Sequence, residues 1–276
     1  MGRKGSRRVM KLEYVPLLRV QRELQGLPRN YARFQQYLRT MLNQDGVELP
    51  LLAIMNPMGK DHVTALLDAL LALDADGVGA RVAADASAAL ADVPGEFKIA
   101  LVVADDLMGG WTNRYDYEFA LRFGSPNRPL ERDPDSPSGF RRPRWLKDFW
   151  LTGVLWSSEP PSARAAREAI LLPTYRLAYV HRHGPARTLR SLLTQEGQVM
   201  AAAGCAGPVL DEDDIAYTRE VLTPFLDADD KRTCIECLCG DAAGRTLGFT
   251  PRGLSPWAGL ALALHDARPG GRKAPG

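Results

Sequence analysis

The chain has 276 residues, of which 45% are hydrophobic and 25% are charged, a composition typical of folded proteins and not of disordered ones. The net charge of +2 is too small to indicate a polyanionic partner, so we do not expect nucleic acid as a ligand. The sequence contains no apolar run of about 18 residues, and charged residues interrupt the segment after the basic start. We therefore expect a cytoplasmic protein with no membrane contact.

Hydrophobic periodicity predicts helices and buried strands in the first half of the chain. Short continuous apolar runs are typical of strands that are buried on both faces, and apolar residues three and four positions apart are typical of helices. In chain order we expect a flexible basic segment at 1–13, helices at 16–24 and after Pro28, a strand at 49–55, a helix at 63–71, a strand or helix at 78–90, and a strand at 97–104.

The second half begins with a stretch, residues 124–144, that contains five prolines and shows no periodicity. This composition indicates a long loop. After it we expect a strand at 150–156, a helix from the N-cap Ser162 to 172, a helix or strand at 175–180, helices along 189–200 and from the N-cap Asp211, a hairpin formed by 233–239 and 245–250, a helix from Ser255 to Leu264, and a disordered tail at 268–276.

The alternation of helices and buried strands predicts an α/β fold, because parallel strands need helical crossovers. We expect a central, mainly parallel sheet flanked by helices, followed by a largely helical C-terminal half with a late β-hairpin. Residues 14–267 are interpreted as a single domain.

Candidate catalytic residues follow the predicted strands. In open α/β sheets, ligands bind beyond the carboxyl ends of the strands. Asp105 and Asp106 come directly after the strand at 97–104, where two adjacent carboxylates can bind a divalent metal or act as a base and its orienting group. Glu159 follows the strand at 150–156 and is a second acid or base candidate.

The same loops carry side chains suited to holding a small anionic ligand. Lys60 opens a predicted helix after a glycine, which favours an anion, although Asp61 stands where a P-loop has Ser or Thr. Aromatic, amide and guanidinium groups follow the Asp pair. The candidate ligand-binding residues are Asn56, Lys60, Trp111, Thr112, Asn113 and Arg114.

Histidine and cysteine patterns suggest two other chemistries. Arg182-His183-Gly184 resembles the histidine phosphatase signature, and His265-Asp266 resembles that family's second motif. The family's first motif normally follows the first strand, whereas here it lies late in the chain, so we interpret these histidines as structural. The four cysteines could bind zinc, although paired CxxC knuckles are missing; they are Cys205, Cys234, Cys237 and Cys239.

These observations lead to three hypotheses. The first is an α/β enzyme that acts on a small polar or anionic molecule through its strand-end loops. The second is a non-catalytic interaction or assembly protein, such as a homo-oligomer, that uses Trp111, Trp145 and the long loop. The third is a thiolate metal-binding protein. The sequence identifies no cofactor, reaction or substrate.

Overall fold

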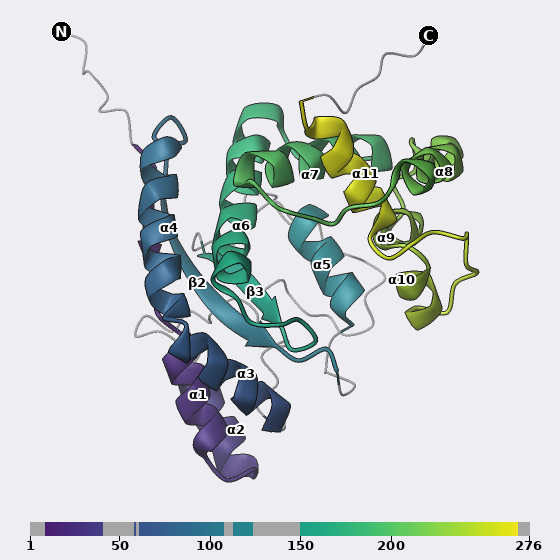
Figure 1. Ribbon diagram of the computed structural model, residues 1–276. Helices are drawn as coiled ribbons and strands as arrows, with labels where there is room; N and C mark the ends of the chain where they lie inside the picture. Colours follow the sequence, from purple (N-terminus) through teal and green to yellow (C-terminus); the bar gives the residue numbers. More distant parts are fainter. Residues whose placement is uncertain (1–8, 41–57, 59–60, 108–112, 124–149, 270–276) are drawn as a thin grey trace, which may run out of the picture. The chain divides into compact units, whose positions relative to one another are not determined.

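The computed structural model describes residues 9–40, 58, 61–107, 113–123 and 150–269, and Figure 1 shows how the helices and strands follow one another. The chain divides into two compact units. Unit 1 comprises Met1–Asn113 and Pro126–Thr174, and unit 2 comprises Arg114–Ser125 and Tyr175–Gly276. The sequence had suggested one domain over 14–267. Within the described ranges, no helix is both long enough and apolar enough to cross a membrane.

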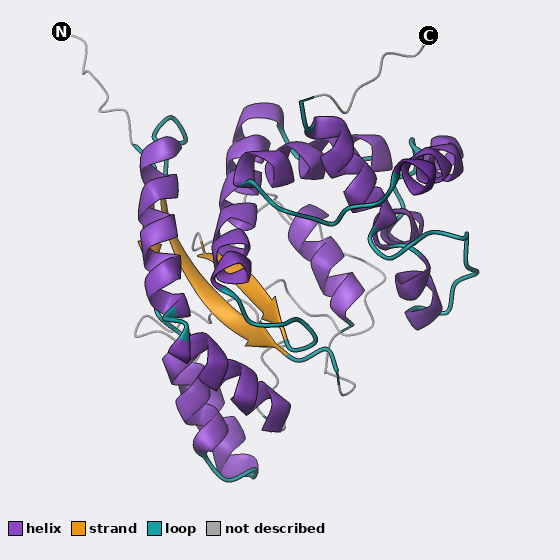
Figure 2. Cartoon of the chain, viewed as in Figure 1, coloured by secondary structure: helices purple, strands orange, loops and turns teal. Residues whose placement is uncertain are grey.

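Unit 1 contains a three-stranded parallel sheet in the order β1-β2-β3. Figure 2 shows β2 and β3 side by side with their arrowheads pointing the same way. The described elements are β1 (Lys11–Tyr14), α1 (Leu18–Gly26), α2 (Tyr31–Thr40), α3 (Asp61–Ala72), α4 (Ala75–Ala89), β2 (Glu96–Ala104), β3 (Trp150–Trp156) and the first part of α6 (Ala163–His183).

Strand β1 corrects the expectation that residues 1–13 are flexible throughout. It pairs with β2 in parallel, from Lys11 opposite Glu96 to Tyr14 opposite Ile99. Met10 and Leu12 are buried, whereas Lys11 is exposed, which is the alternation of a strand with one buried face. The basic residues around this short alternation concealed it in the sequence.

Beyond the end of β1, a glutamine side chain replaces the missing strand partner. Gln21 on α1 is 2% exposed. Its Nε2 donates to the carbonyl of Val103 at 2.7 Å, and the Val103 N–H donates to Gln21 Oε1 at 2.9 Å. Both backbone groups of Val103 are thereby satisfied, as burial requires, and α1 is held against the last part of β2.

Strand β3 and helix α6 approach closely through a glycine and a proline. A Cβ at Gly153 would lie 2.6 Å from the carbonyl oxygen of Ala169. Pro173 lies four residues after Ala169 and has no N–H to bond that carbonyl. The Ala169 carbonyl thus lacks its helical hydrogen bond at the same place where Gly153 has no side chain, so the strand and the helix can approach closely. The boundary between the two units follows Pro173, after Thr174.

Unit 2 is built from helices packed around α11. Its elements are α5 (Arg114–Phe123), the second part of α6, α7 (Leu189–Ala203), α8 (Glu212–Leu222), the 3-10 helix η2 (Thr223–Phe225), α9 (Lys231–Cys239), α10 (Asp241–Thr246) and α11 (Ala258–Ala267). Helices α7, α8 and α9 all contact α11. Glycines allow two of these contacts, because a Cβ at Gly197 would lie 2.2 Å from the Ala263 carbonyl oxygen and one at Gly259 would lie 2.3 Å from that of Cys237.

The parallel α/β sheet and the helical C-terminal half are confirmed, but the hairpin predicted at 233–239 and 245–250 is wrong. The first segment lies in α9 and most of the second lies in α10 or the turn after it. Asp230 caps α9 by accepting from the Thr233 N–H at 2.9 Å, a signal that favours a helix start over a strand. The ambiguous stretch 78–90 is helical in α4, and 175–180 is helical in α6.

The predicted strands at 97–104 and 150–156 correspond to β2 and β3. The predicted helix at 63–71 corresponds to α3, in which Val63, Leu66, Leu67 and Leu70 are buried. The predicted strand at 49–55 and the predicted loop at 124–144 lie outside the described residues.

Candidate functional site

The carboxyl ends of β2 and β3 bring polar side chains together. The register pairs Ala104 with Trp156, and the Ser157 N–H continues the ladder by donating to the Ala104 carbonyl at 2.8 Å. Asp105 and Ser157 therefore leave neighbouring strands at the same level. His62, in the first turn of α3, completes the group. We call His62, Asp105, Asp106, Ser157 and Ser158 the strand-end cluster.

Asp105 is the buried centre of this cluster, with its side chain 1% exposed. Its Oδ1 lies 2.8 Å from His62 Nε2 and accepts from the Ser157 hydroxyl at 3.0 Å and from the Leu107 N–H at 3.2 Å. A buried carboxylate needs such donors because an unpaired charge is costly away from water. Asp105 thus fixes the position of both a histidine and a serine.

Asp106 has a different set of partners from Asp105. Its Oδ1 accepts from the Ser158 N–H at 2.9 Å, and its Oδ2 accepts from the Ser158 hydroxyl at 2.7 Å. Its own N–H donates to Ser157 Oγ at 3.1 Å. These contacts fasten the turn after β3 to the end of β2. Asp106 therefore holds the turn after β3 in place.

The Ser157 hydroxyl lies between the two carboxylates, 3.0 Å from Asp105 Oδ1 and 3.1 Å from Asp106 Oδ1. A hydroxyl has one proton to donate, so it can serve only one carboxylate at a time. The two carboxylates therefore offer more acceptor capacity than this one hydroxyl can satisfy.

The contact with Asp105 determines the tautomer of His62. An ionised carboxylate can only accept, so Nε2 of His62 must carry the proton. The neutral imidazole then has its lone pair on Nδ1. The His62 side chain is 27% exposed while its partner carboxylate is buried. This arrangement, an oriented imidazole with one basic nitrogen, is suited to general acid–base chemistry.

The structure describes all three predicted catalytic residues. Asp105 and Asp106 are both in the cluster, as described above. Glu159 lies in the turn after β3 at an exposed position, and its N–H donates to the Trp156 carbonyl at 3.0 Å.

The predicted ligand-binding residues are only partly described. Asn113 is half-buried at the end of the first segment of unit 1. Arg114 opens α5 in unit 2, where its guanidinium carbon lies 5.1 Å from the centre of the Trp257 ring. Four residues lie outside the described ranges: Asn56, Lys60, Trp111 and Thr112.

Sequence reasoning gave no role to His62, Ser157 or Ser158. A signal for them existed, because His62 follows the Gly-Lys pair at the start of a predicted helix and the two serines follow a predicted strand. The link between His62 and Asp105 spans 43 positions. Such a pairing depends on how α3 lies against the sheet, which periodicity does not predict.

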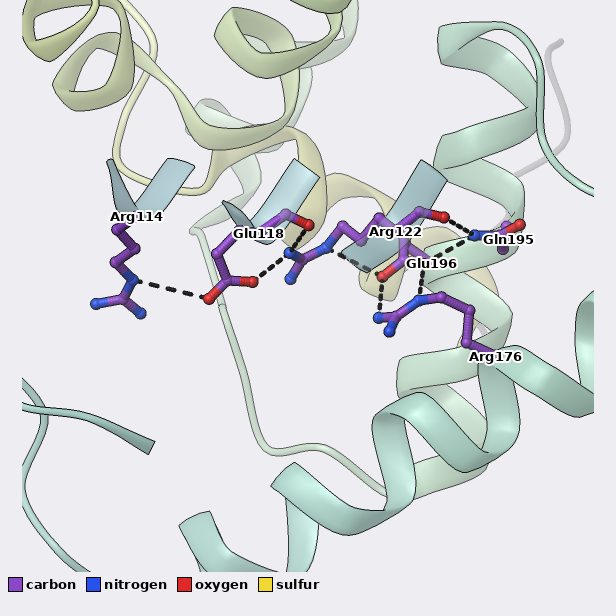
Figure 3. Close-up of polar contacts among 6 residues, drawn as sticks. All are labelled: Arg114, Glu118, Arg122, Arg176, Gln195 and Glu196. Carbon is purple, nitrogen blue, oxygen red and sulfur yellow. Dashed lines mark hydrogen bonds and ion pairs between the residues drawn. The ribbon is translucent and has the colours of Figure 1, made fainter. Parts of the chain in front are cut away.

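Unit 2 holds a second polar group, which we call the buried ion network: Arg114, Glu118, Arg122, Arg176, Gln195 and Glu196 (Figure 3). Glu196 is fully buried and accepts from Arg176 in a two-pronged contact, with both distances 2.7 Å. Arg122 Nε lies 3.1 Å from Glu196 Oε2, and Arg122 also pairs with Glu118. Gln195 Nε2 donates to the Arg122 carbonyl at 3.0 Å.

The electrostatics of the buried ion network are those of a structural element. Burial by itself raises the pKa of Glu196, but the Arg176 and Arg122 guanidinium groups outweigh it and lower the pKa to about 2. Burial by itself lowers the pKa of Arg122, but the Glu118 and Glu196 carboxylates raise it above its ordinary value. Both groups therefore stay charged at neutral pH, so neither is suited to proton transfer.

The four cysteines are buried free thiols. Burial raises the pKa of Cys234, Cys237 and Cys239 to about 12, so these thiols are protonated at neutral pH and pack as small apolar groups. His181 and His183 lie in the last turn of helix α6, where residues two apart point in different directions. Among the described residues, no three His, Cys, Asp or Glu side chains gather in a way that could hold a metal ion.

No protein-family model, curated protein or solved structure matches the chain. The strand-end cluster is thus the candidate site on the strength of its own geometry: a buried carboxylate, an oriented imidazole and two hydroxyls at the carboxyl edge of a parallel sheet.

Proposed function

We propose that the protein is an enzyme that binds a small polar or anionic molecule at the carboxyl edge of β2 and β3, and that His62 transfers a proton to or from it. The observation that carries this proposal is the 2.8 Å contact between His62 Nε2 and the buried Asp105 carboxylate. A buried acid that orients a partly exposed imidazole is a recurring arrangement for general acid–base work.

Each residue of the cluster has a distinct role in this proposal. His62 is the base, through Nδ1, and becomes the acid once it is protonated. Asp105 holds the imidazole in the correct tautomer and stabilises its positive charge. Asp106 is a positioning residue that fixes the turn with Ser157 and Ser158.

The Ser157 hydroxyl donates to carboxylates, and no described hydrogen bond joins it to His62. A serine nucleophile needs its base within hydrogen-bond reach. The geometry therefore favours proton transfer over covalent acyl chemistry. Glu159 remains a proposed second acid or base, and the proposed ligand-binding residues remain Asn56, Lys60, Trp111, Thr112, Asn113 and Arg114.

The proposal is tested by comparing the activity of the wild-type protein with that of a His62→Gln variant. Both proteins are incubated with a mixture of small polar metabolites, and the mixture is followed by mass spectrometry. We expect at least one compound to be converted by the wild type and converted about 10²–10⁴-fold more slowly by His62→Gln. Asp105→Asn should slow the same reaction.

The matched control is His181→Gln, because His181 is exposed in α6 of the same chain. This variant should convert the compound at the wild-type rate. Conversion that is equally fast in His62→Gln, or no conversion of any compound by the wild type, would overturn the proposal.

A further inference from the structure

Unit 2 contains a groove of about 640 Å³ between three helices. Helix α11 lies between α7 and α8 in its packing, since it contacts both. On α7 the groove is lined by Arg190, Leu193, Thr194 and Gln198, positions that share one helix face. These positions extend along about 12 Å of the α7 axis. The hollow is therefore elongated along a helix.

The floor of this groove is apolar. Leu222 from the end of α8 and Leu262 from α11 are buried beneath it, at 1% and 5% exposed. Leu193 on α7 and Leu226 after η2 line it and are half-buried. Two half-buried leucines together with two buried ones give the groove an apolar floor suited to receiving apolar side chains at helical spacing.

The rim of the groove is positively charged. Three arginines and one aspartate line it: Arg190, Arg219, Arg268 and Asp266. Arg219 pairs with Asp266 at 2.6 Å, and Arg190 pairs with Asp227 at 3.2 Å. The arginines are half-exposed or more in these pairs, at 50% and 58%. Exposed pairs contribute little to stability, so a ligand carboxylate can replace or join them at small cost.

Arg268 differs from the other two arginines of the rim. Its Nη2 donates to the carbonyls of Cys205 and Ala206 at 2.8 and 3.2 Å, and within the described part of the chain no carboxylate pairs with it. Arg268 and Pro269 also line a second hollow of about 210 Å³, next to Val209, which is 66% exposed. Arg268 therefore lines both hollows, and among the described residues its hydrogen-bond partners are neutral carbonyls.

We propose that this arginine-rimmed groove binds an amphipathic helix of a partner protein, with leucine-like residues on its apolar face and carboxylates along its edges. The rim carries more positive than negative charge, and its three arginines come from three different helices or helix ends, so several separated carboxylates match it better than a single anionic head group. The seven residues that follow Pro269 carry two basic side chains and no acidic one, so charge does not favour them as the occupant.

The test uses a designed probe, a fluorescein-labelled peptide of about 15–20 residues. It has leucines at positions i, i+3, i+4 and i+7 and glutamates beside them. A second peptide has lysine at every glutamate position. Fluorescence anisotropy with the full chain should show saturable binding of the glutamate peptide, weakened by added salt, and no binding of the lysine peptide.

Three variants locate the binding site. Arg190→Glu and Arg268→Glu reverse charges on the rim, and each should weaken the binding of the glutamate peptide by roughly tenfold or more. Thr194→Trp fills the groove from the exposed side of α7 and should weaken it without a change in charge. Arg245→Glu is the matched control, because Arg245 is exposed on α10, outside the groove, and its binding should match the wild type.

Circular dichroism establishes that each variant keeps the wild-type helix content, so that a loss of binding reports on the groove. Equal binding of the lysine peptide, unchanged binding in both rim variants, or no binding of the glutamate peptide would overturn the proposal. Dodecanoate serves as a competitor. If it bound the groove more tightly than the peptide, the site would belong to a small amphipathic acid, and the helix proposal would be wrong.

Discussion

The strand-end cluster and the buried ion network use similar side chains in opposite ways. In the network, the Glu196 carboxylate is fully buried and lies between two guanidinium groups, which hold its pKa at about 2. In the cluster, the Asp105 carboxylate is just as buried, but its partners are an imidazole, a hydroxyl and an N–H. Only the cluster pairs its buried carboxylate with an imidazole, the His62 side chain.

We infer that the buried charges of the network have a structural role, whereas the buried charge of the cluster has a chemical one. Arginine stays protonated, so the network keeps one charge state and holds α5, α6 and α7 of unit 2 together. The cluster is partly open to solvent at His62, at 27% exposed. We therefore expect mutations in the network to change stability most, and mutations in the cluster to change reactivity most.

The largest expected effect on stability comes from Glu196→Gln. The change leaves the Arg122 and Arg176 guanidinium groups buried without their shared carboxylate. Removal of one partner of a buried ion pair costs about 3–5 kcal/mol, which urea unfolding can measure. Glu220→Gln is the control, because Glu220 is exposed on α8. A loss no larger than that of the control would show that the network contributes nothing to stability.

The network also predicts how stability depends on pH. The pKa of Glu196 is about 2 in the folded chain against an ordinary value of 4.5. Because the pKa of Glu196 is lower in the folded chain than in the unfolded chain, its carboxylate contributes fully to stability above the unfolded pKa. This contribution is lost as the pH falls towards about 2. The difference between the two pKa values corresponds to about 3 kcal/mol of folding stability. Urea unfolding between pH 6 and pH 2.5, at roughly half-unit steps, measures this loss of stability.

Comparison of the pH dependence of the wild type with that of Glu196→Gln isolates this single carboxyl group. The variant lacks the titrating group, so its stability should fall less steeply over the same acidic range. Parallel curves for the two proteins would assign the acid sensitivity to other carboxylates and would contradict the role given to Glu196.

The sequence predicted the parts of the fold that local patterns encode. The apolar runs at 97–104 and 150–156 are strands, and the leucine spacing of α3 matches its buried face. The Asp pair after β2 was predicted as part of a site because parallel strands end at one edge. The burial of Asp105 and the position of the pair beside the end of β3 were not evident from the sequence.

Other features could not be predicted because they depend on tertiary packing. Strand β1 is only four residues long, too short to stand out among basic neighbours. Residues 233–239 were predicted as one strand of a hairpin, whereas the cap at Asp230 and packing against α11 favour a helix. His62 joins Asp105 only because α3 begins beside the end of β2, and the ion network of unit 2 likewise joins distant helices.

A smaller loss of stability is expected from Gly153→Ala, next to the strand-end cluster along β3. The added Cβ would lie 2.6 Å from the Ala169 carbonyl oxygen and 2.9 Å from Leu101 Cδ2. Overpacking of this kind costs about 1–3 kcal/mol, measured by thermal or urea unfolding. Ala202→Ser, at an exposed position of α7, is the control. A fully stable Gly153→Ala protein would show that β3 and α6 are less closely packed than the contact implies.

The smallest expected change in stability is that of His62→Gln, and it is the most informative about the cluster. A glutamine amide can still donate to Asp105, and the side chain is partly exposed, so the free energy of unfolding should change by less than about 1 kcal/mol. The same substitution should remove the proposed proton transfer, because an amide has no basic nitrogen. Urea unfolding and metabolite turnover on one protein sample measure both quantities. If His62→Gln instead lost as much stability as Glu196→Gln, the imidazole would be a packing element, and the distinction between a structural and a chemical carboxylate in this chain would fail.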